Sequence, residues 1–246
     1  MSTKPLGRKN YGSIPHLPNS RMGPADKHCE EGQAKIATEQ ARDKNDEIIV
    51  QEKIDGSNVG VAKKDGKLFS LTRAGYAADT SPYEQHHFFS DWVEKNKDIF
   101  MELLNDGERL AGEWLMQAHG TRYKLSHGPF VAFDILVGHK RMPHDAFIDR
   151  LSDFDVVTPH LIHRGDPITV VEVMEILDKK GFHGAIDEVE GAIWRVERDK
   201  ATGVKGEKKR VIDFLVKYVR PDKKDGIYLP SVSGKEAVWN WQPPLT

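Results

Sequence analysis

One short segment, EKIDGSN at residues 52–58, contains side chains that can support nucleophilic chemistry. Its Asp-Gly-Ser centre is typical of a tight turn, because these residues accept the backbone angles that a turn needs. A turn does not account for Lys53, which ends an apolar run and has a glutamate directly before it. A lysine amine attacks electrophiles once it has lost its proton, so Lys53 is a candidate for covalent catalysis. Taken alone, a Lys-x-Asp-Gly sequence is weak evidence, since such turns are common.

Five further segments place a polar or aromatic residue inside or beside a strand-like run. Each has a simple structural explanation when it is considered alone. Phe133, for example, alternates with Val131 and Ile135 as a core residue of a strand would, and an isolated lysine such as Lys217 is typical of a protein surface. Their joint order along the chain is the stronger observation: Arg73 in LTRAGY, Glu113 in LAGEWL, Phe133 in FVAFDIL, Glu190 in VEGAIWR and Lys217 in FLVKYV.

Together with EKIDGSN, these segments resemble the ordered motifs of the covalent nucleotidyltransferases, the superfamily of DNA ligases, RNA ligases and mRNA capping enzymes. The resemblance extends over residues 48–220, which is most of the chain. The glutamate before Lys53, FDIL and EGAIWR are most similar to the phage-type nick-sealing RNA ligases. The resemblance implies an ATP-dependent RNA ligase. Such an enzyme joins a 5′-phosphate to a 3′-hydroxyl through a lysyl-AMP intermediate and an adenylated 5′ end.

The same resemblance assigns roles to residues of this chain. Lys53 would carry AMP after pyrophosphate leaves, and Lys217 would neutralise the α-phosphate as charge develops there. Because the attacking amine must be deprotonated, we expect Lys217 or a bound metal ion to lower the pKa of Lys53. Phe133 would stack on adenine and Glu113 would contact the ribose. The full set that the resemblance places around the nucleotide is Glu52, Asp55, Asn58, Arg73, Glu113, Phe133 and Arg220.

The implied cofactors are ATP and Mg²⁺, with Mn²⁺ as an alternative cation. The resemblance assigns Glu190 to the metal, and Glu113 is a second carboxylate for it. Magnesium commonly takes only one or two protein carboxylates together with substrate phosphates, so a larger acidic cluster is not required. Glu190 lies in the acidic sequence DEVE, which makes Glu188 a rival. Several histidines match no metal-ligand spacing and are expected to be ordinary helix and loop residues: His86, His87, His119 and His127.

Two features depart from the family pattern. The fifth motif of the nick-sealing RNA ligases usually has two lysines separated by one residue, whereas Leu215 and Val219 occupy those positions around Lys217. Arg220 is therefore the candidate for the second charge. Only 26 residues follow Arg220, too few for an oligonucleotide-binding barrel or a helical C-terminal domain. Binding of RNA would then depend on residues 1–46 or on a partner protein. A minimal DNA ligase, and a nucleotide- or RNA-binding module without turnover, are the alternatives.

The elements that must position these residues are strands in hairpins, with helices between groups of them. Asp65-Gly66 predicts a tight hairpin turn. Ser81–Glu84 and Thr169–Glu172 each predict a capping box that starts a helix, and Gly181 is expected to end the second helix. This order favours an α+β fold of antiparallel sheets flanked by helices. The resemblance specifies it further as a nucleotidyltransferase (ATP-grasp-like) domain, here without a C-terminal barrel.

We expect three parts: an irregular lead-in at residues 1–46, an adenylyltransferase domain at 47–221, and a tail at 222–246 that packs on the domain through Trp239 and Trp241. The net charge of −2 gives no sign of nucleic-acid binding, but residues 198–225 contain ten Lys or Arg against five Asp or Glu. Such a stretch is either a phosphate-binding surface or a solvated charge run.

The composition also bears on the compartment. No run is apolar enough to span a membrane. Cys29 is the single cysteine, which excludes an internal disulfide and a thiolate-rich zinc site. A cytoplasmic protein without a membrane partner is therefore expected.

Overall fold

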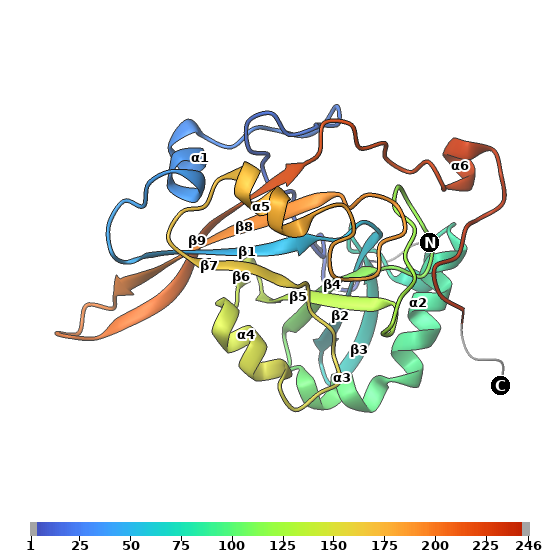
Figure 1. The fold of residues 1–246 in the computed structure, drawn as a ribbon. Coiled ribbons are helices and arrows are strands. Elements are labelled where there is room, and N and C mark those ends of the chain that lie inside the picture. The colour runs from blue at the N-terminus through green and yellow to red at the C-terminus, as the bar shows by residue number, and fades with distance from the viewer. Residues whose placement is uncertain (1–3, 243–246) are drawn as a thin grey trace.

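The computed structural model describes residues 4–242, which form two antiparallel sheets surrounded by helices (Figure 1). The first sheet has the order β7-β1-β8-β9 and consists of β1 (Asp46–Lys53), β7 (Leu161–Gly165), β8 (Gly191–Ala201) and β9 (Lys208–Val219). The second has the order β3-β2-β4-β5-β6 and consists of β2 (Ser57–Lys64), β3 (Lys67–Thr72), β4 (Glu108–Trp114), β5 (Phe130–Val137) and β6 (Lys140–Arg141). Within residues 4–242 neither sheet closes into a barrel. The expected α+β class is confirmed.

Helices cover the two sheets and bury their apolar faces. They are α1 (Glu31–Thr38), η1 (Ala78–Thr80), α2 (Glu84–Lys95), α3 (Lys97–Leu103), α4 (His144–Leu151), α5 (Val170–Leu177) and α6 (Pro230–Ser233). Phe89 of α2 packs on Trp114 and Phe130 of the second sheet, and Trp239 and Trp241 of the C-terminal segment join this core. The first sheet has a separate core, around Trp194 and Val216, to which α1 and α5 contribute. No helix among the described residues is both long enough and apolar enough to cross a membrane.

Local sequence signals account for some element boundaries and fail at others. Asp65 and Gly66 both have positive φ angles, of 51° and 68°, as the predicted hairpin turn between β2 and β3 requires. The capping box of Thr169 at the start of α5 is also present. The box predicted at Ser81 is wrong: α2 begins at Glu84, and the Ser81 hydroxyl instead bonds to Nδ1 of His86 at 2.6 Å. Helix α5 ends at Leu177, before the predicted stop.

The segment that carries the nucleophile joins the two sheets. Lys53 is the last residue of β1 in the first sheet, and Ser57 is the first residue of β2 in the second. Residues 54–56 therefore form a direct crossing between sheets, where the main chain is held by both. The amide of Asp55 donates to the hydroxyl of Tyr123 at 3.0 Å, and the amide of Gly56 donates to Oε1 of Glu113 at 3.1 Å. The crossing is thus fixed by side chains of the surrounding core.

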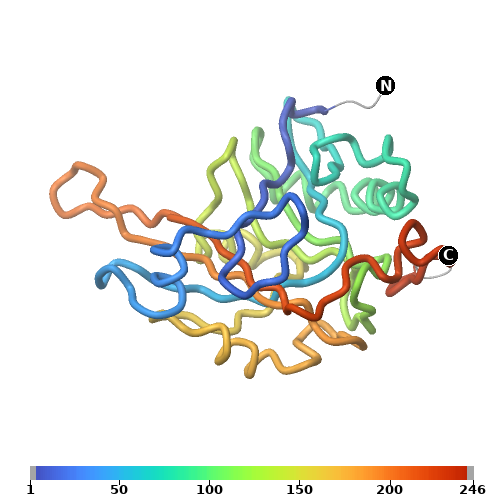
Figure 2. The backbone as a smooth tube through the Cα atoms, turned by 90° about the horizontal axis from the view of Figure 1, so that it is seen from above, coloured from blue at the N-terminus to red at the C-terminus, as the bar shows by residue number. Residues whose placement is uncertain are grey.

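Both terminal segments pack against the domain. The N-terminal segment runs parallel to the end of β9, because the amide of Lys217 donates to the carbonyl of Pro15 and the amide of Leu17 donates to the carbonyl of Lys217. This pairing covers the edge of the first sheet. The C-terminal segment crosses to the second sheet, where Asn240 bonds to the carbonyl of Met116. Figure 2 shows both segments on the same side of the molecule. The region expected as an irregular lead-in therefore contains α1 and an ordered strand-like contact.

Candidate active site

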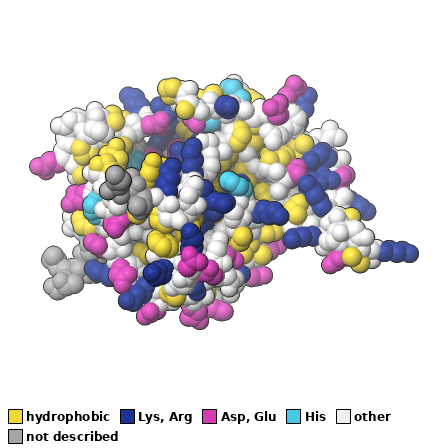
Figure 3. Space-filling view, turned by 180° about the vertical axis from the view of Figure 1, so that it is seen from behind, with side chains coloured by type: hydrophobic (Ala, Val, Ile, Leu, Met, Phe, Trp, Pro, Cys, Tyr) yellow, Lys and Arg dark blue, Asp and Glu magenta, His cyan; other side chains and the backbone are white. Residues whose placement is uncertain are grey.

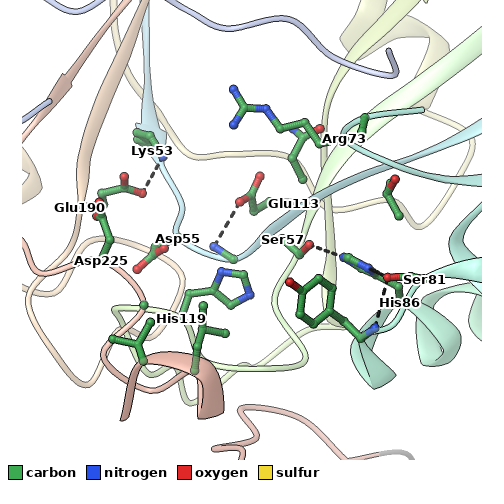
Figure 4. A pocket seen from close by; sticks show the side chains of 18 of the residues that line it. Lys53, Asp55, Ser57, Arg73, Ser81, His86, Glu113, His119, Glu190 and Asp225 are labelled. Atoms are coloured by element: carbon green, nitrogen blue, oxygen red, sulfur yellow. Dashed lines mark hydrogen bonds and ion pairs between the residues drawn. The ribbon is translucent and has the colours of Figure 1, made fainter. Parts of the chain in front are cut away.

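Two adjoining cavities lie at the crossing between the sheets. The larger has a volume of about 970 Å³ and the smaller about 170 Å³. They share five lining residues, which are Lys53, Asn58, Arg73, Glu113 and Lys217. Asp55 and Glu190 line only the larger cavity, and Glu52 and Phe133 only the smaller. The structure therefore brings together every site residue predicted from the sequence except Arg220, and Figure 4 shows several of them around the larger cavity.

Lys53 is held in its protonated form by carboxylates. Its Nζ donates to Oε2 of Glu190 at 2.6 Å. Burial alone would lower the pKa of Lys53, but Glu190, Glu113 and Asp55 outweigh this effect and raise the pKa above its ordinary value. Lys217 therefore does not bring the pKa of Lys53 below its ordinary value in this arrangement of side chains, and the lowering by a bound metal ion stays a prediction. Any chemistry at Nζ needs positive charge that offsets the carboxylates.

Two acids face Lys53: the half-buried Glu113 on β4 of the second sheet, and the buried Glu190, which directly precedes β8 of the first. Burial, with the nearby charges of Glu190 and Asp55, raises the pKa of Glu113 to about 7 despite the opposing effect of Lys53. The pKa of Glu190 is also raised by burial. Both shifts arise first from burial, so positive charge brought by a ligand would lower the pKa of both acids. Glu188, the rival of Glu190, lies outside both cavities and pairs with Arg220 at 2.5 Å.

The donor set fits a divalent cation that is shared with a substrate. Within residues 4–242, no three His, Cys, Asp or Glu side chains converge as a metal site. A closed protein cage is therefore not built here. Glu190 and Glu113 supply carboxylates next to a large cavity, which matches a magnesium ion that takes its remaining ligands from phosphates and water.

The N-terminal segment contributes two residues that no sequence pattern indicated, His16 and Asp26. Oδ1 of Asp26 lies 3.7 Å from Nζ of Lys217, and Oδ2 of Asp26 lies 3.2 Å from Nε2 of His16. His16 is only 1% exposed and, like Asp26, lines the larger cavity. Burial, then Lys53, lowers the pKa of Lys217, while Asp26 opposes the shift. The predicted phosphate-binding lysine therefore has a counter-ion from residues expected to be irregular.

The C-terminal segment contributes a buried lysine, Lys223, that pairs with a site residue but lines neither cavity. Nζ of Lys223 lies 2.8 Å from Oδ2 of Asp55, with side chains 2% and 14% exposed. The guanidinium of Arg220 is instead occupied by Glu188, Asp222 and the carbonyl of Val189. The basic stretch at residues 198–225 contains both Arg220 and Lys223, and its composition does not indicate which of the two pairs with a site residue.

The smaller cavity has apolar walls and unpaired polar atoms. Phe133, Ile193 and Leu215 line it, together with Tyr11 and Ile14 of the N-terminal segment. Several buried atoms at this cavity have no hydrogen-bond partner, and these are Oε1 of Glu52, Oδ1 of Asn58, and Nε and Nη1 of Arg195. Burial raises the pKa of Glu52 to about 7. Flat apolar walls with unpaired donors and acceptors suit a heterocyclic base.

Across the larger cavity, a hydrogen-bonded relay faces Lys53. The Ser57 hydroxyl lies 2.8 Å from Nε2 of His86, whose Nδ1 contacts Ser81 (Figure 4). Burial, followed by His119 and His87, lowers the pKa of His86 to about 4, so the ring is neutral.

Arg73 makes no ion pair with any residue in the described range, and its Nη2 donates to the Ser13 hydroxyl at 3.3 Å. Its charge is therefore free for an anionic ligand.

Comparisons with known proteins agree with this geometry. Residues 46–219 match the family model described as RNA ligase. Solved structures of similar fold include the Naegleria gruberi RNA ligase with pyrophosphate, at 16% identity over 95% of this chain and 60% of that chain, with a TM-score of 0.53. An arginine-to-alanine variant of the same ligase with ATP and Mn gives 17% identity over 89% of this chain and 57% of that chain, with a TM-score of 0.54.

The matched Naegleria gruberi chains are longer than this chain. The chain spans only about 57–60% of the two Naegleria gruberi chains, and identities of 16–17% indicate a shared fold. Among individually curated proteins, none matches this sequence. The fold and the family assignment both agree with the order of motifs that begins at EKIDGSN.

Proposed function

Because the chain belongs to the RNA ligase family, we propose that it is an ATP-dependent RNA ligase that carries AMP on Lys53. The observation that carries the proposal is the position of Lys53 at the junction of a base-sized cavity and a larger one lined by several charged side chains. The smaller cavity would hold adenine beside Phe133, and the larger would hold the polyphosphate. The α-phosphorus then lies next to the lysine amine.

Three transfers complete the reaction. The lone pair of Lys53 Nζ attacks the α-phosphorus, the nitrogen–phosphorus bond forms, and the bond to pyrophosphate breaks as the amine loses its proton. A 5′-phosphate of RNA then displaces the lysine, which leaves AMP joined to the RNA through a new P–O–P linkage. Finally, a 3′-hydroxyl attacks the 5′-phosphorus and AMP departs. Lys217 and Arg73 would neutralise the phosphate charge that develops at each transfer.

The acids of the site are consistent with this chemistry. Glu190 and Glu113 would hold Mg²⁺ or Mn²⁺ together with the phosphates of ATP. When bound, such a cation would supply the positive charge that offsets these carboxylates and favours the neutral Lys53 amine. Glu52, with an unpaired Oε1 in the smaller cavity, would accept a hydrogen bond from the amino group of adenine.

The substrate would be RNA with a 5′-phosphate and a 3′-hydroxyl, held at a nick or within another structured end. A DNA nick is the alternative acceptor. A nucleotide-binding module without turnover is the alternative from another class, and the raised pKa of Lys53 is the observation in its favour. A partner protein would supply further nucleic-acid contacts if this chain alone binds RNA weakly.

One labelling experiment tests the proposal. The protein is incubated with Mg²⁺ and ATP labelled on the α-phosphate, then denatured, with GTP in a parallel sample. Label from ATP should stay on the protein, disappear in Lys53→Ala, and persist in Lys95→Ala, which changes an exposed lysine of α2. Sealing of nicked RNA and nicked DNA then identifies the acceptor. Folded protein that binds ATP but takes no label would exclude the ligase mechanism.

A further inference from the structure

The β8–β9 hairpin extends beyond the sheet to which it belongs. Strand β1 accompanies β8 only as far as the pair Asp46–Arg198, whereas β8 and β9 stay paired as far as Ala201–Lys208. Residues 199–210 therefore form a two-stranded projection, here named the arm, that stands out from the domain in Figures 1 and 2. An isolated two-stranded ribbon gains little stability from burial. Its length is therefore not explained by packing.

The arm concentrates positive charge in a protein whose net charge is −2. Its sequence, DKATGVKGEKKR, holds five Lys or Arg and two Asp or Glu. Some of these cations are paired: Lys200 with Asp213 at 3.1 Å, and Arg210 with Glu47 and Glu197. The others form a second group, for which residues 4–242 provide no carboxylate partner, and these are Lys205, Lys208 and Lys209.

Lys208 and Lys209 begin β9, the strand that leads to the candidate active site, and the Lys208 ammonium donates to Oδ1 of Asn45 at 3.0 Å. Strand β9 is continuous from Lys208 to Lys217, a distance of about 30 Å at roughly 3.3 Å per residue. Leu215 and Lys217 line the cavities. Because the strand register shifts at Val196/Glu197, Lys208 lies on the same face of the hairpin as these two residues. In Figure 3, further Lys and Arg side chains lie between the protruding arm and the centre of this face.

We propose, on the basis of the ligase function proposed above, that the arm binds the phosphate backbone of an RNA duplex extending from the joint. Lysines act as point charges toward phosphates, so this contact would be independent of sequence. The deep, narrow major groove of A-form RNA excludes a reading of base edges there. A reach of about 30 Å corresponds to roughly one helical turn. The arm would therefore act only on duplexes about ten base pairs or longer on its side of the joint.

The test compares long and short RNA. The triple variant Lys205→Ala, Lys208→Ala and Lys209→Ala is matched by Lys67→Ala, Lys95→Ala and Lys140→Ala, which removes three exposed lysines of the second sheet and α2. Binding is measured without ATP to nicked duplexes with roughly 20 base pairs, or roughly 6 base pairs closed by stable hairpins, on each side. This separates the arm from the ligase chemistry, which is followed as labelling of Lys53.

The arm variant should bind the long duplex about 10-fold more weakly, and its slope of affinity against salt should fall by about two to three. The short duplex should be bound equally well by all proteins, and labelling of Lys53 should not change. Equal losses on long and short RNA, an equal loss in the matched variant, or an unchanged affinity for the long duplex would each overturn the proposal. The last result would also follow if the arm binds an acidic protein instead of RNA.

Discussion

Oδ1 of Asp26 lies 3.7 Å from Nζ of Lys217, so the N-terminal segment provides the nearest anion to a lysine of the last strand. The α-phosphate of ATP would compete for the same ammonium group. Asp26 thus positions Lys217 beside the cavity and keeps it charged in a buried setting. His16, held by the same carboxylate, completes this contact.

Asp26→Asn should shift the pH dependence of Lys53 labelling. Burial and Lys53 lower the pKa of Lys217, and Asp26 and Glu190 oppose that shift. Without the Asp26 charge, Lys217 loses its proton at a lower pH, so the decline of the labelling rate on the alkaline side should begin earlier. Asp26→Glu should restore the native profile. Superimposable profiles for the native protein and Asp26→Asn would contradict this role.

Lys217→Ala and Arg220→Ala should differ sharply in Lys53 labelling. Lys217 lines both cavities, whereas Arg220 is bound to Glu188 and Asp222 outside them. Loss of a charge at the reacting phosphate commonly costs about 100-fold or more in rate, and we expect that of Lys217→Ala. Arg220→Ala should change the rate by less than about 3-fold, since it touches no reacting group. Comparable losses would restore Arg220 as the second cation of the fifth motif.

Phe133→Ala should weaken ATP binding while leaving the fold intact. An aromatic ring that stacks on a base contributes about 1–3 kcal/mol by alanine substitution, so the ATP concentration for half-maximal labelling should rise roughly 5- to 150-fold. Phe133→Tyr should retain most of the affinity, because it keeps the ring. If the two variants bound ATP alike, the smaller cavity would not hold the base.

Glu52→Gln should stabilise the protein at neutral and alkaline pH. Burial raises the pKa of Glu52 to about 7, so the folded protein holds this proton more tightly than the unfolded chain. The resulting stability is present below about pH 4.5 and is lost as the pH rises to 7. Glutamine avoids the loss, and its unfolding free energy should exceed the native value by about 2–3 kcal/mol at pH 8 but not at pH 4.5. Denaturant unfolding at both pH values checks this.

Lys223→Ala should destabilise the protein. It removes one partner of a buried ion pair and leaves Asp55 beside two other buried carboxylates, a change that typically costs about 3–5 kcal/mol. Lys224→Ala, at the exposed neighbouring position, should stay within about 0.5 kcal/mol of the native protein. In the double variant with Asp55→Ala the two losses should be less than additive, and full additivity would show that the pair is not coupled.

The site residues that lie on strands could be predicted from the sequence, for a physical reason. Lys53 and Glu113 lie on central strands and Lys217 on the edge strand β9, and strand alternation and pairing fix which side chains reach the cavity. The order of motifs could therefore be read along the chain. His16 and Asp26 could not be found this way, because they reach the site through a parallel contact between distant segments that has no local pattern.

Local signals also fail where a side chain has a tertiary partner. Ser81 has the composition of a helix cap, yet its hydroxyl is engaged by His86. Arg220 has the positive charge expected of the second cation in the fifth motif and lies close to its expected position. The carboxylates of Glu188 and Asp222, however, hold the guanidinium outside the cavities. Lys223, three residues later, reaches Asp55 because the chain turns after β9. Such choices depend on packing that no single segment determines.

The parallel contact between Pro15–Arg21 and Lys217–Val219 has a consequence for the order of folding. The two partners lie at opposite ends of the described chain, so a ribosome releases the first long before the second. Closing a loop of that length is entropically costly and comes late in folding. The proposed ATP site is therefore incomplete until β9 has emerged, and a nascent chain would gain its nucleotide-binding capacity only after that strand.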